Sequence, residues 1–178
     1  MGEQVILNKQ DIERILNETA EKLYREIPNV EDLAIVGIQT RGVELATRLL
    51  SRLERLSGKT IKFGTLDITF YRDDIATRGV LPVIKETKIE FNITKKTILL
   101  VDDVLFTGRT TKAALETLTT FGRPQAIRLF VLVDRGNREL PIQPDYFGFR
   151  IETSVEDKVR VRLNIHDNTE DHVTLANP

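Results

Sequence analysis

A pair of carboxylates follows a short apolar run and gives the chain its first candidate for chemistry. Residues Ile98 to Val101 are apolar throughout, which predicts a strand buried on both faces. Asp102 and Asp103 come at its carboxyl end, where an open α/β sheet binds its ligands. Carboxylates in such a place can hold sugar hydroxyls or a hard cation such as Mg²⁺. We therefore expect a polar ligand site at the end of this strand.

The turn after the acid pair suits a phosphate. Residues 106–111 include Gly108, which lets the backbone approach a ligand closely, and threonines whose hydroxyls can donate. An amphipathic helix begins here, and a helix N-terminus offers unpaired N–H groups to an anion. Neither a Walker loop nor G-x-G-x-x-G occurs in the chain. The stretch predicts a site for a phosphorylated sugar with Mg²⁺; the simpler alternative is a turn whose acid pair only caps the helix.

A second strand end also suits an anion. The apolar residues 33–38 are followed by Thr40, Arg41 and Gly42, after which another helix is expected. The glycine permits a tight turn, and Arg41 carries a forked and permanently charged group. Two such strand ends in one sheet fit a substrate with phosphates at both ends. Taken alone, the segment also fits a helix start with a solvated arginine.

Two further polar segments could contribute residues to a site. Asp134 and Arg135 follow the strand expected at 127–133, where Arg135 could bind an anion or a base with Asp134 orienting it; the simpler alternative is an exposed ion pair. In residues 66–79 the apolar alternation breaks at Arg72, so composition alone favours an exposed hairpin tip over a loop that closes beside the reacting centre and excludes water. His166 and His172 lie in an acidic, polar tail and are expected to be surface residues rather than metal ligands.

The whole chain is expected to form one cytoplasmic domain. It has 178 residues, 40% of them apolar and 30% charged, which suits a single globular unit of about 100–200 residues. With no cysteine there is no disulfide or thiol nucleophile. No signal peptide or membrane span is recognisable. A formal charge of −1 gives no general attraction to nucleic acid.

The expected elements alternate between strands and helices, which predicts a parallel sheet with right-handed crossovers. The first helix has Asn8 as N-cap, and the second ends at Gly58 with Leu45, Leu49, Leu53 and Leu56 facing inward. We expect helices at 8–27 and about 43–56, and strands at 33–38, 61–71, 98–101, 127–133, 146–148 and 159–163, with 88–93 a possible partner of 61–71.

These motifs together resemble a known family. Acid-acid-x-x-x-Thr-Gly-x-Thr after a buried strand closely resembles the signature of type I phosphoribosyltransferases. Seven ordered blocks resemble the PyrR family of uracil phosphoribosyltransferases and pyrimidine-operon attenuation regulators. They are Val36–Gly42, Asp67–Asp74, Asp102–Thr110, Gly122–Pro124, Val131–Gly136, Arg138–Ile142 and Thr153–Ser154.

The resemblance implies an α/β fold with a central, mostly parallel sheet flanked by helices and a small β-rich hood. The single domain would span 1–178, with the core at about 8–135 and the hood at about 136–178 together with part of the N-terminus. It also implies a homo-oligomer, at least a dimer, to which the apolar Phe147 and Phe149 add support because a lone small domain would leave them partly exposed.

The implied reaction joins uracil to phosphoribosyl pyrophosphate, giving UMP and pyrophosphate, with Mg²⁺ as cofactor and UMP or UTP as effectors of binding to pyrimidine leader mRNA. Asp102, Asp103 and Arg72 would be catalytic, with Asp103 also at the metal. Thr40, Arg41 and Gly42 would contact the leaving pyrophosphate, and Arg135 and Val159 (in the hood segment Lys158–Arg160) would lie near the base. Other substrate contacts would come from Val104, Leu105, Phe106, Thr107, Gly108, Arg109, Thr110 and Thr111.

Departures from the family pattern fall mainly on the RNA-binding side. Glu21 and Asn137 replace histidines, Gln143 an arginine and Phe149 a lysine, whereas the transferase site departs only at Phe106, a tyrosine in the pattern. Each lost cation removes a possible phosphate contact, which leaves Arg138, Arg150 and Arg160 as RNA-binding candidates. Three alternatives stay open: a phosphoribosyltransferase for another base, an RNA-binding regulator that uses the pocket only as a nucleotide sensor, and a catalytically silent binding module.

Overall fold

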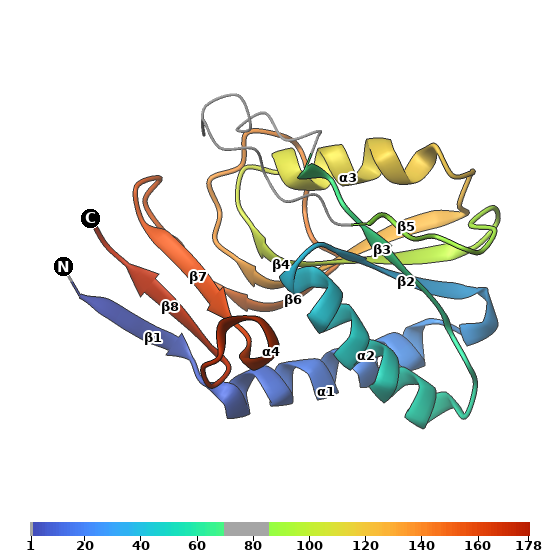
Figure 1. Ribbon diagram of the computed structural model, residues 1–178, viewed down its shortest axis with the longest axis horizontal. Coiled ribbons are helices and arrows are strands. Elements are labelled where there is room, and N and C mark those ends of the chain that lie inside the picture. The colour runs from blue at the N-terminus through green and yellow to red at the C-terminus, as the bar shows by residue number, and fades with distance from the viewer. Residues whose placement is uncertain (1, 70–85) are drawn as a thin grey trace.

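The computed structural model describes residues 2–69 and 86–178 (Figure 1). The expected catalytic segment around Arg72 lies outside these residues. The helices are α1 (Lys9–Glu26), the short 3₁₀ helix η1 (Val30–Asp32), α2 (Arg41–Ser57), α3 (Arg109–Thr119) and α4 (Asn164–Asp167). The strands are β1 (Glu3–Leu7), β2 (Leu33–Ile38), β3 (Lys62–Leu66), β4 (Thr97–Leu105), β5 (Ala126–Asp134), β6 (Tyr146–Arg150), β7 (Lys158–Arg162) and β8 (His172–Ala176).

A parallel five-stranded sheet forms the centre of the molecule. Its order is β3-β2-β4-β5-β6, and each neighbouring pair is parallel. The middle strands β2 and β4 consist largely of buried apolar residues, as strands covered on both faces must. The predicted α/β class is confirmed.

Helices cover both faces of this sheet. In Figure 1, α1 and α2 lie along one face and α3 lies along the other. The apolar side chains follow the same division. One cluster joins α1 and α2 to Ile35, Leu99 and Phe130, and a second joins α3 to Val36, Leu100 and Val131. Because neighbouring residues of a strand point to opposite faces, these alternating positions supply both layers.

A second, antiparallel sheet forms the hood. Its order is β1-β8-β7, so the two ends of the chain lie side by side at the left of Figure 1. β1, from the N-terminus, pairs with β8 in this sheet. β6, which lies in the segment assigned to the hood from the sequence, pairs with β5 in the main sheet, where Phe130 is opposite Tyr146. Tyr146 and Phe149 of β6 are partly buried against the apolar cluster that includes residues of α1.

Helices α1 and α2 follow the predicted patterns with one exception. Asn8 caps α1 and forms a reciprocal capping box with Asp11, and Gly58 ends α2 with φ of 68°. Leu45, Leu49 and Leu53 are buried, but Leu56 is 43% exposed. The prediction that Leu56 faces inward was wrong. The buried leucines follow one another at intervals of four residues, whereas Leu56 comes three residues after Leu53 and lies off the buried stripe in the last turn.

The segment around residues 61–71 is shorter as a strand than predicted. β3 covers Lys62–Leu66 and pairs in parallel with β2, whereas residues 88–93 contribute only an isolated antiparallel bridge between Thr65 and Lys88. Ile93 is instead buried in the cluster under α3. Because Ile93 packs there, the segment after the bridge at Lys88 leaves β3 and leads to the start of β4. None of the helices in the described ranges is long and apolar enough to cross a membrane.

Candidate active site at the carboxyl ends of the strands

The two predicted anion-binding segments meet at adjacent strand ends. β2 and β4 run parallel, with Gly37 opposite Val101, so the residues after β2 lie beside the end of β4. Gly42, the second residue of α2, packs on the backbone of Val101 and Asp102 so closely that an added Cβ would stand 2.5 Å from the Val101 oxygen. The strand register and the packing of Gly42 therefore place Thr40, Arg41 and Gly42 next to the acid pair. The peptide bond between Gln39 and Thr40 is cis.

The acid pair lies within β4 rather than after it. β4 continues to Leu105 because its pairing with β5 persists to Leu105 opposite Asp134, so the predicted end at Val101 was too early. Asp102 is 7% exposed, and one of its oxygens accepts the Asp103 N–H at 2.9 Å. Oδ1 of Asp103 accepts the Val104 N–H at 2.9 Å. This local bonding fixes both carboxylates, and among the described residues Oδ2 of Asp103 has no hydrogen-bond partner.

The turn after β4 has the geometry expected of an anion-binding helix start. Gly108 has φ of 94° and stands at the N-cap of α3, and no side chain caps the helix. A residue other than glycine would be strained in this left-handed conformation. The Thr107 hydroxyl accepts the Arg109 N–H at 3.3 Å, and Thr110 is partly exposed whereas Thr111 is buried. Val104 and Phe106 are partly exposed beside this turn, and Leu105 is buried.

Residues 138–142 brace the turn, a role that the sequence did not predict. The Thr107 carbonyl accepts the N–H groups of Glu139 and Leu140, and the Glu139 carboxylate accepts Arg109 Nε at 2.6 Å. Arg138 donates to the Phe106 carbonyl at 3.0 Å and to the Ile142 carbonyl at 2.8 Å. The only sequence signal for this bracing was the position of an Arg-Glu pair shortly after a strand end, which by itself is common.

Asp134 does not orient Arg135, contrary to the prediction. Asp134 instead accepts Arg138 Nη2 at 2.6 Å and Arg150 Nε at 3.0 Å. Burial by itself opposes ionisation of Asp134, but hydrogen bonds from Arg138, the Gly136 N–H and Arg150 outweigh it and hold the pKa of this carboxyl below its usual value. Asp134 is therefore ionised at neutral pH.

Arg135 is held by neutral groups. Its guanidinium lies 3.9 Å from the centre of the Phe106 ring, and it donates to the Thr153 hydroxyl at 3.0 Å and the Ser154 carbonyl at 2.7 Å. The residue is 6% exposed, and burial lowers its pKa, an effect that the charge of Asp157 only partly offsets. Arg135 is thus a buried cation that stacks on Phe106 beside the start of α3, and such a group suits an anionic ligand or one with several carbonyl oxygens.

Arg41 and Val159 connect the site to the hood. Arg41, 34% exposed, makes a two-pronged ion pair with Asp167, at the end of α4. Val159 lies in β7, an edge strand of the hood sheet, where it is opposite Leu175. A contact between this edge and a base stays a prediction. No pattern in the sequence predicts that Asp167 reaches Arg41, because the two residues are 126 positions apart.

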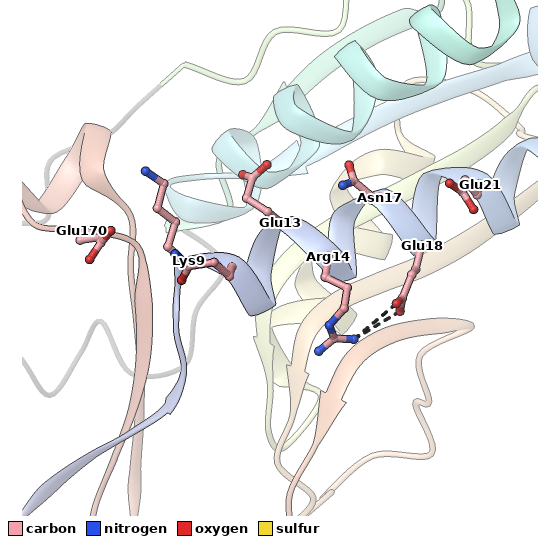
Figure 2. A pocket seen from close by; sticks show the side chains of 8 residues that line it. Lys9, Glu13, Arg14, Asn17, Glu18, Glu21 and Glu170 are labelled. Atoms are coloured by element: carbon pink, nitrogen blue, oxygen red, sulfur yellow. Dashed lines mark hydrogen bonds and ion pairs between the residues drawn. The ribbon is translucent and has the colours of Figure 1, made fainter.

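The three RNA-binding candidates are all engaged within the chain. Arg138 is 13% exposed and committed to Asp134, Arg150 stacks 4.2 Å from the centre of the Phe147 ring, and Arg160 lies 3.5 Å from Glu3. Glu21 lines a shallow pocket of about 450 Å³ on α1, and Figure 2 shows Glu13 and Glu18 from the same helix and Glu170 from the hood around it. Among the described residues, no cluster of three or more His, Cys, Asp or Glu side chains forms a metal-binding group.

Comparisons with known proteins agree with this geometry. The phosphoribosyl transferase domain family matches residues 4–166. "Bifunctional protein PyrR" of Roseiflexus sp. (strain RS-1) is 46% identical over 176 residues, covering 99% of this chain and 96% of that protein. The protein of the same name from Desulfosudis oleivorans is 48% identical over 174 residues, covering 97% and 96%.

Solved structures show the same fold at low sequence identity. A hypoxanthine phosphoribosyltransferase from Staphylococcus aureus matches with a TM-score of 0.72 at 22% identity, covering 98% of this chain and 93% of that one. A hypoxanthine-guanine phosphoribosyltransferase from Bacillus anthracis matches with a TM-score of 0.74 at 16% identity, covering 98% of both chains. The phosphoribosyl transferase domain and the near full-length similarity to PyrR proteins show that this chain belongs to the PyrR family of phosphoribosyltransferases.

Proposed function

We propose that this protein is a uracil phosphoribosyltransferase, which forms UMP and pyrophosphate from uracil and phosphoribosyl pyrophosphate. The observation that carries the proposal is the meeting of the acid pair, the uncapped start of α3 and the start of α2 at neighbouring strand ends. This arrangement suits a sugar with phosphates at both ends. The choice of uracil rests on the similarity to PyrR proteins, since the structural neighbours named for hypoxanthine share only the fold.

Mg²⁺ is the proposed cofactor, and the donor set fits it. Asp103 offers a partly exposed carboxylate whose Oδ1 is fixed by the Val104 N–H. Mg²⁺ prefers one or two carboxylates together with substrate oxygens and water rather than a cage of protein ligands, which agrees with the lack of a larger acidic cluster in the described ranges. When bound by Asp103 and Asp102, Mg²⁺ would supply positive charge beside the pyrophosphate oxygens.

The protein's own residues would orient the substrate and offset its changing charge. As the bond from the anomeric carbon to pyrophosphate breaks, the ribose becomes more positive and the leaving oxygen more negative. Asp102 and Asp103 would hold the ribose hydroxyls on the positive side, and Arg41 would stabilise the negative side. Thr107, Thr110 and the N–H groups at the start of α3 would fix the 5′-phosphate, which orients the reacting carbon.

Base recognition would depend on Arg135 and the edge of β7. Arg135 is a buried donor stacked on Phe106, and a uracil carbonyl oxygen is a suitable acceptor for it. The backbone of Lys158–Arg160, at the edge of the hood sheet, would match the donor and acceptor pattern of the pyrimidine.

The decisive experiment measures nucleotide formation from phosphoribosyl pyrophosphate and Mg²⁺ with uracil, hypoxanthine, guanine or orotate in parallel. We expect UMP formation with uracil and a kcat/KM at least about a hundredfold lower with the other bases, the scale at which a polar site rejects a mismatched base. Preferential turnover of a purine or of orotate would contradict the choice of uracil. No turnover with any base would instead support a nucleotide-sensing module.

The second proposed activity is uridine-nucleotide-dependent regulation of a pyrimidine operon through its leader mRNA. Similarity to proteins named as bifunctional PyrR supports it. The ion pairs of Arg138 and Arg160 and the carboxylates along α1 argue that RNA binding is weak or altered in this protein. We therefore propose the transferase as the main activity, with cytoplasmic location and a homo-oligomer as further expectations.

A further inference from the structure

The hood contacts the candidate pyrophosphate-binding segment through one ion pair. Arg41 Nη2 donates to Asp167 Oδ1 at 2.6 Å, and Arg41 Nε donates to Asp167 Oδ2 at 3.3 Å. The Asp167 side chain is only 8% exposed, and its Oδ2 also accepts the Leu163 N–H at 2.8 Å. Asp167 is thereby fixed to the backbone at the start of α4, so it presents a rigid two-oxygen edge to the arginine.

This pairing leaves part of the guanidinium available. Arginine has five N–H donors in a planar fork, and Asp167 engages Nε and one donor of Nη2. Within the described residues, Nη1 donates to no other group. Arg41 is the first residue of α2, immediately before Gly42, which packs against Asp102. The guanidinium can therefore bind an anion at the strand ends through Nη1 while Asp167 holds its other edge.

We propose that Asp167 is a positioning residue that holds Arg41 in the orientation that binds the pyrophosphate group of the substrate. The proposal rests on the proposed function and extends it to a hood residue that makes no contact with substrate. A side chain that is already oriented loses less rotational freedom on binding than a free arginine would. Burial opposes ionisation of Asp167, but the hydrogen bonds from Arg41 and the Leu163 N–H keep its pKa below the usual value, so it is charged at neutral pH.

A second ion pair of the same kind provides a matched control. Asp171 accepts Arg48 Nη1 at 2.5 Å and the Asn164 N–H at 2.8 Å, and its side chain is 5% exposed. Arg48 lies on α2, seven residues after Arg41, and it also pairs with Glu44 at 2.7 Å. Asp167 and Asp171 thus anchor the hood to α2 in the same way, but only Asp167 touches the arginine at the strand ends.

The test compares Asp167→Asn with Asp171→Asn. Asparagine keeps an acceptor for the Leu163 or Asn164 N–H and removes the charge, so both variants weaken one hood anchor. We expect Asp167→Asn to raise the KM for phosphoribosyl pyrophosphate and the Kd of Mg²⁺-pyrophosphate by about tenfold or more, with kcat changed less than about threefold, because positioning acts on binding. Asp171→Asn should change either constant by less than about threefold, and Asp167→Glu should restore part of the loss.

Calorimetric titration with Mg²⁺-pyrophosphate keeps this test separate from the identity of the base, because it needs no turnover. If uracil is not a substrate but Asp167→Asn still weakens pyrophosphate binding selectively, the proposed function fails and the positioning role stands.

Equal effects of the two variants would reduce Asp167 to a structural anchor and overturn the proposal. Tighter pyrophosphate binding in Asp167→Asn would also overturn it, because Asp167 would then compete with the ligand. In an Arg41→Gln background, Asp167→Asn should have no further effect on binding.

Discussion

Gly42 lies directly against the carbonyl oxygen of Val101, and this contact joins the start of α2 to the strand that carries the acid pair. A Cβ at residue 42 would stand 2.5 Å from that oxygen and 3.2 Å from the Cα of Asp102. Both neighbours are backbone atoms of a central strand, so neither can move away without disturbing the sheet. The glycine thus allows the start of α2 to pack directly on the backbone of β4 at Asp102.

Gly42→Ala should therefore destabilise the protein and impair the site. We expect the free energy of unfolding to fall by about 1–3 kcal/mol, the usual effect of forcing an extra methyl group into a packed interior. Urea denaturation measures this effect, and the KM for phosphoribosyl pyrophosphate should rise in the same variant. Gly2→Ala is the control, because nothing lies within 4 Å of an added Cβ there. Unchanged stability in Gly42→Ala would contradict the close packing.

The acid pair should carry most of the catalytic effect. Replacing Asp102 and Asp103 together by asparagine keeps their size and removes both charges, so kcat/KM for UMP formation should fall by at least about a hundredfold. Glu116→Gln is the control and should keep normal activity, because Glu116 is exposed on α3 and, among the residues that the structure describes, forms an ion pair with Lys112 alone. Near wild-type turnover in the double variant would refute the assigned role of the acid pair.

Local sequence patterns predicted the α/β class and the bounds of some elements, but the predicted strand at 98–101 ended too early and the one at 61–71 was too long. The apolar run of β2 gave both of its bounds, and Asn8 gave the start of α1, since burial on both faces and helix capping depend only on neighbouring residues. The position of the start of α2 beside the acid pair also followed from the parallel sheet, because parallel strands end at the same edge.

Long-range ionic contacts could not be predicted in this way. Asp134 lies next to Arg135 in the sequence, yet its partners are Arg138 and Arg150, because the strand directs successive side chains to opposite faces. Asp167 and Arg41 come together only when the hood folds onto α2. A charge pattern in a polar tail carries no information about such a partner, so the sequence analysis assigned no role to Asp167.

Asp134 should make stability depend on pH in the acidic range. Its pKa is lowered in the folded protein, so its contribution is fully present above the unfolded value of about 3.9 and is lost as the pH falls through the lower folded value. At pH 7, Asp134→Asn should reduce the free energy of unfolding by about 2 kcal/mol, the scale of buried hydrogen bonds to charged groups. Below about pH 4 the difference from wild type should narrow.

Chemical denaturation at several pH values between 3 and 7 measures this difference. Glu156→Gln is the control, because Glu156 is exposed in the loop after Ser154 and makes no hydrogen bond or ion pair with the other described residues, so this variant should stay within about 0.5 kcal/mol of wild type. A difference between wild type and Asp134→Asn that stayed constant across this range would mean that the two arginines do not stabilise the ionised carboxylate.

The exposed aromatic surface of β6 should support a homo-oligomer. Phe147 is 42% exposed on β6, which is an edge strand of the main sheet, and a chain of 20.3 kDa should therefore elute as at least a dimer in size-exclusion chromatography with light scattering. Phe147→Ser should shift the protein toward the monomer. Phe121→Ser is matched in exposure at 43% and lies after α3, so it should leave the mass unchanged. A monomer at all micromolar concentrations would contradict the prediction.

RNA binding should be weak, because the surface charges oppose it. The first 33 residues contain eight acidic and four basic side chains, and Figure 2 shows how Glu13, Glu18 and Glu21 follow one another along α1. Asp134 and Glu3 lie in ion pairs with Arg138 and Arg160 and offset part of their charge, which reduces what these two arginines can contribute to binding a phosphate. Counterion release from phosphate contacts supplies most RNA affinity, and each lost cation lowers both the affinity and its dependence on salt.

A salt titration of binding to the organism's own pyrimidine leader RNA, with UMP present, measures both quantities. We expect a Kd in the micromolar range or weaker at physiological salt, with little preference over an unrelated RNA of equal length. Glu21→His, which introduces the side chain that an RNA-competent relative carries there, should strengthen binding more than Glu116→His on the opposite side of the sheet, because only the former removes a negative charge from α1. Nanomolar affinity with a steep salt slope in the wild-type protein would show that the leader is recognised through contacts that the charges on α1 do not govern.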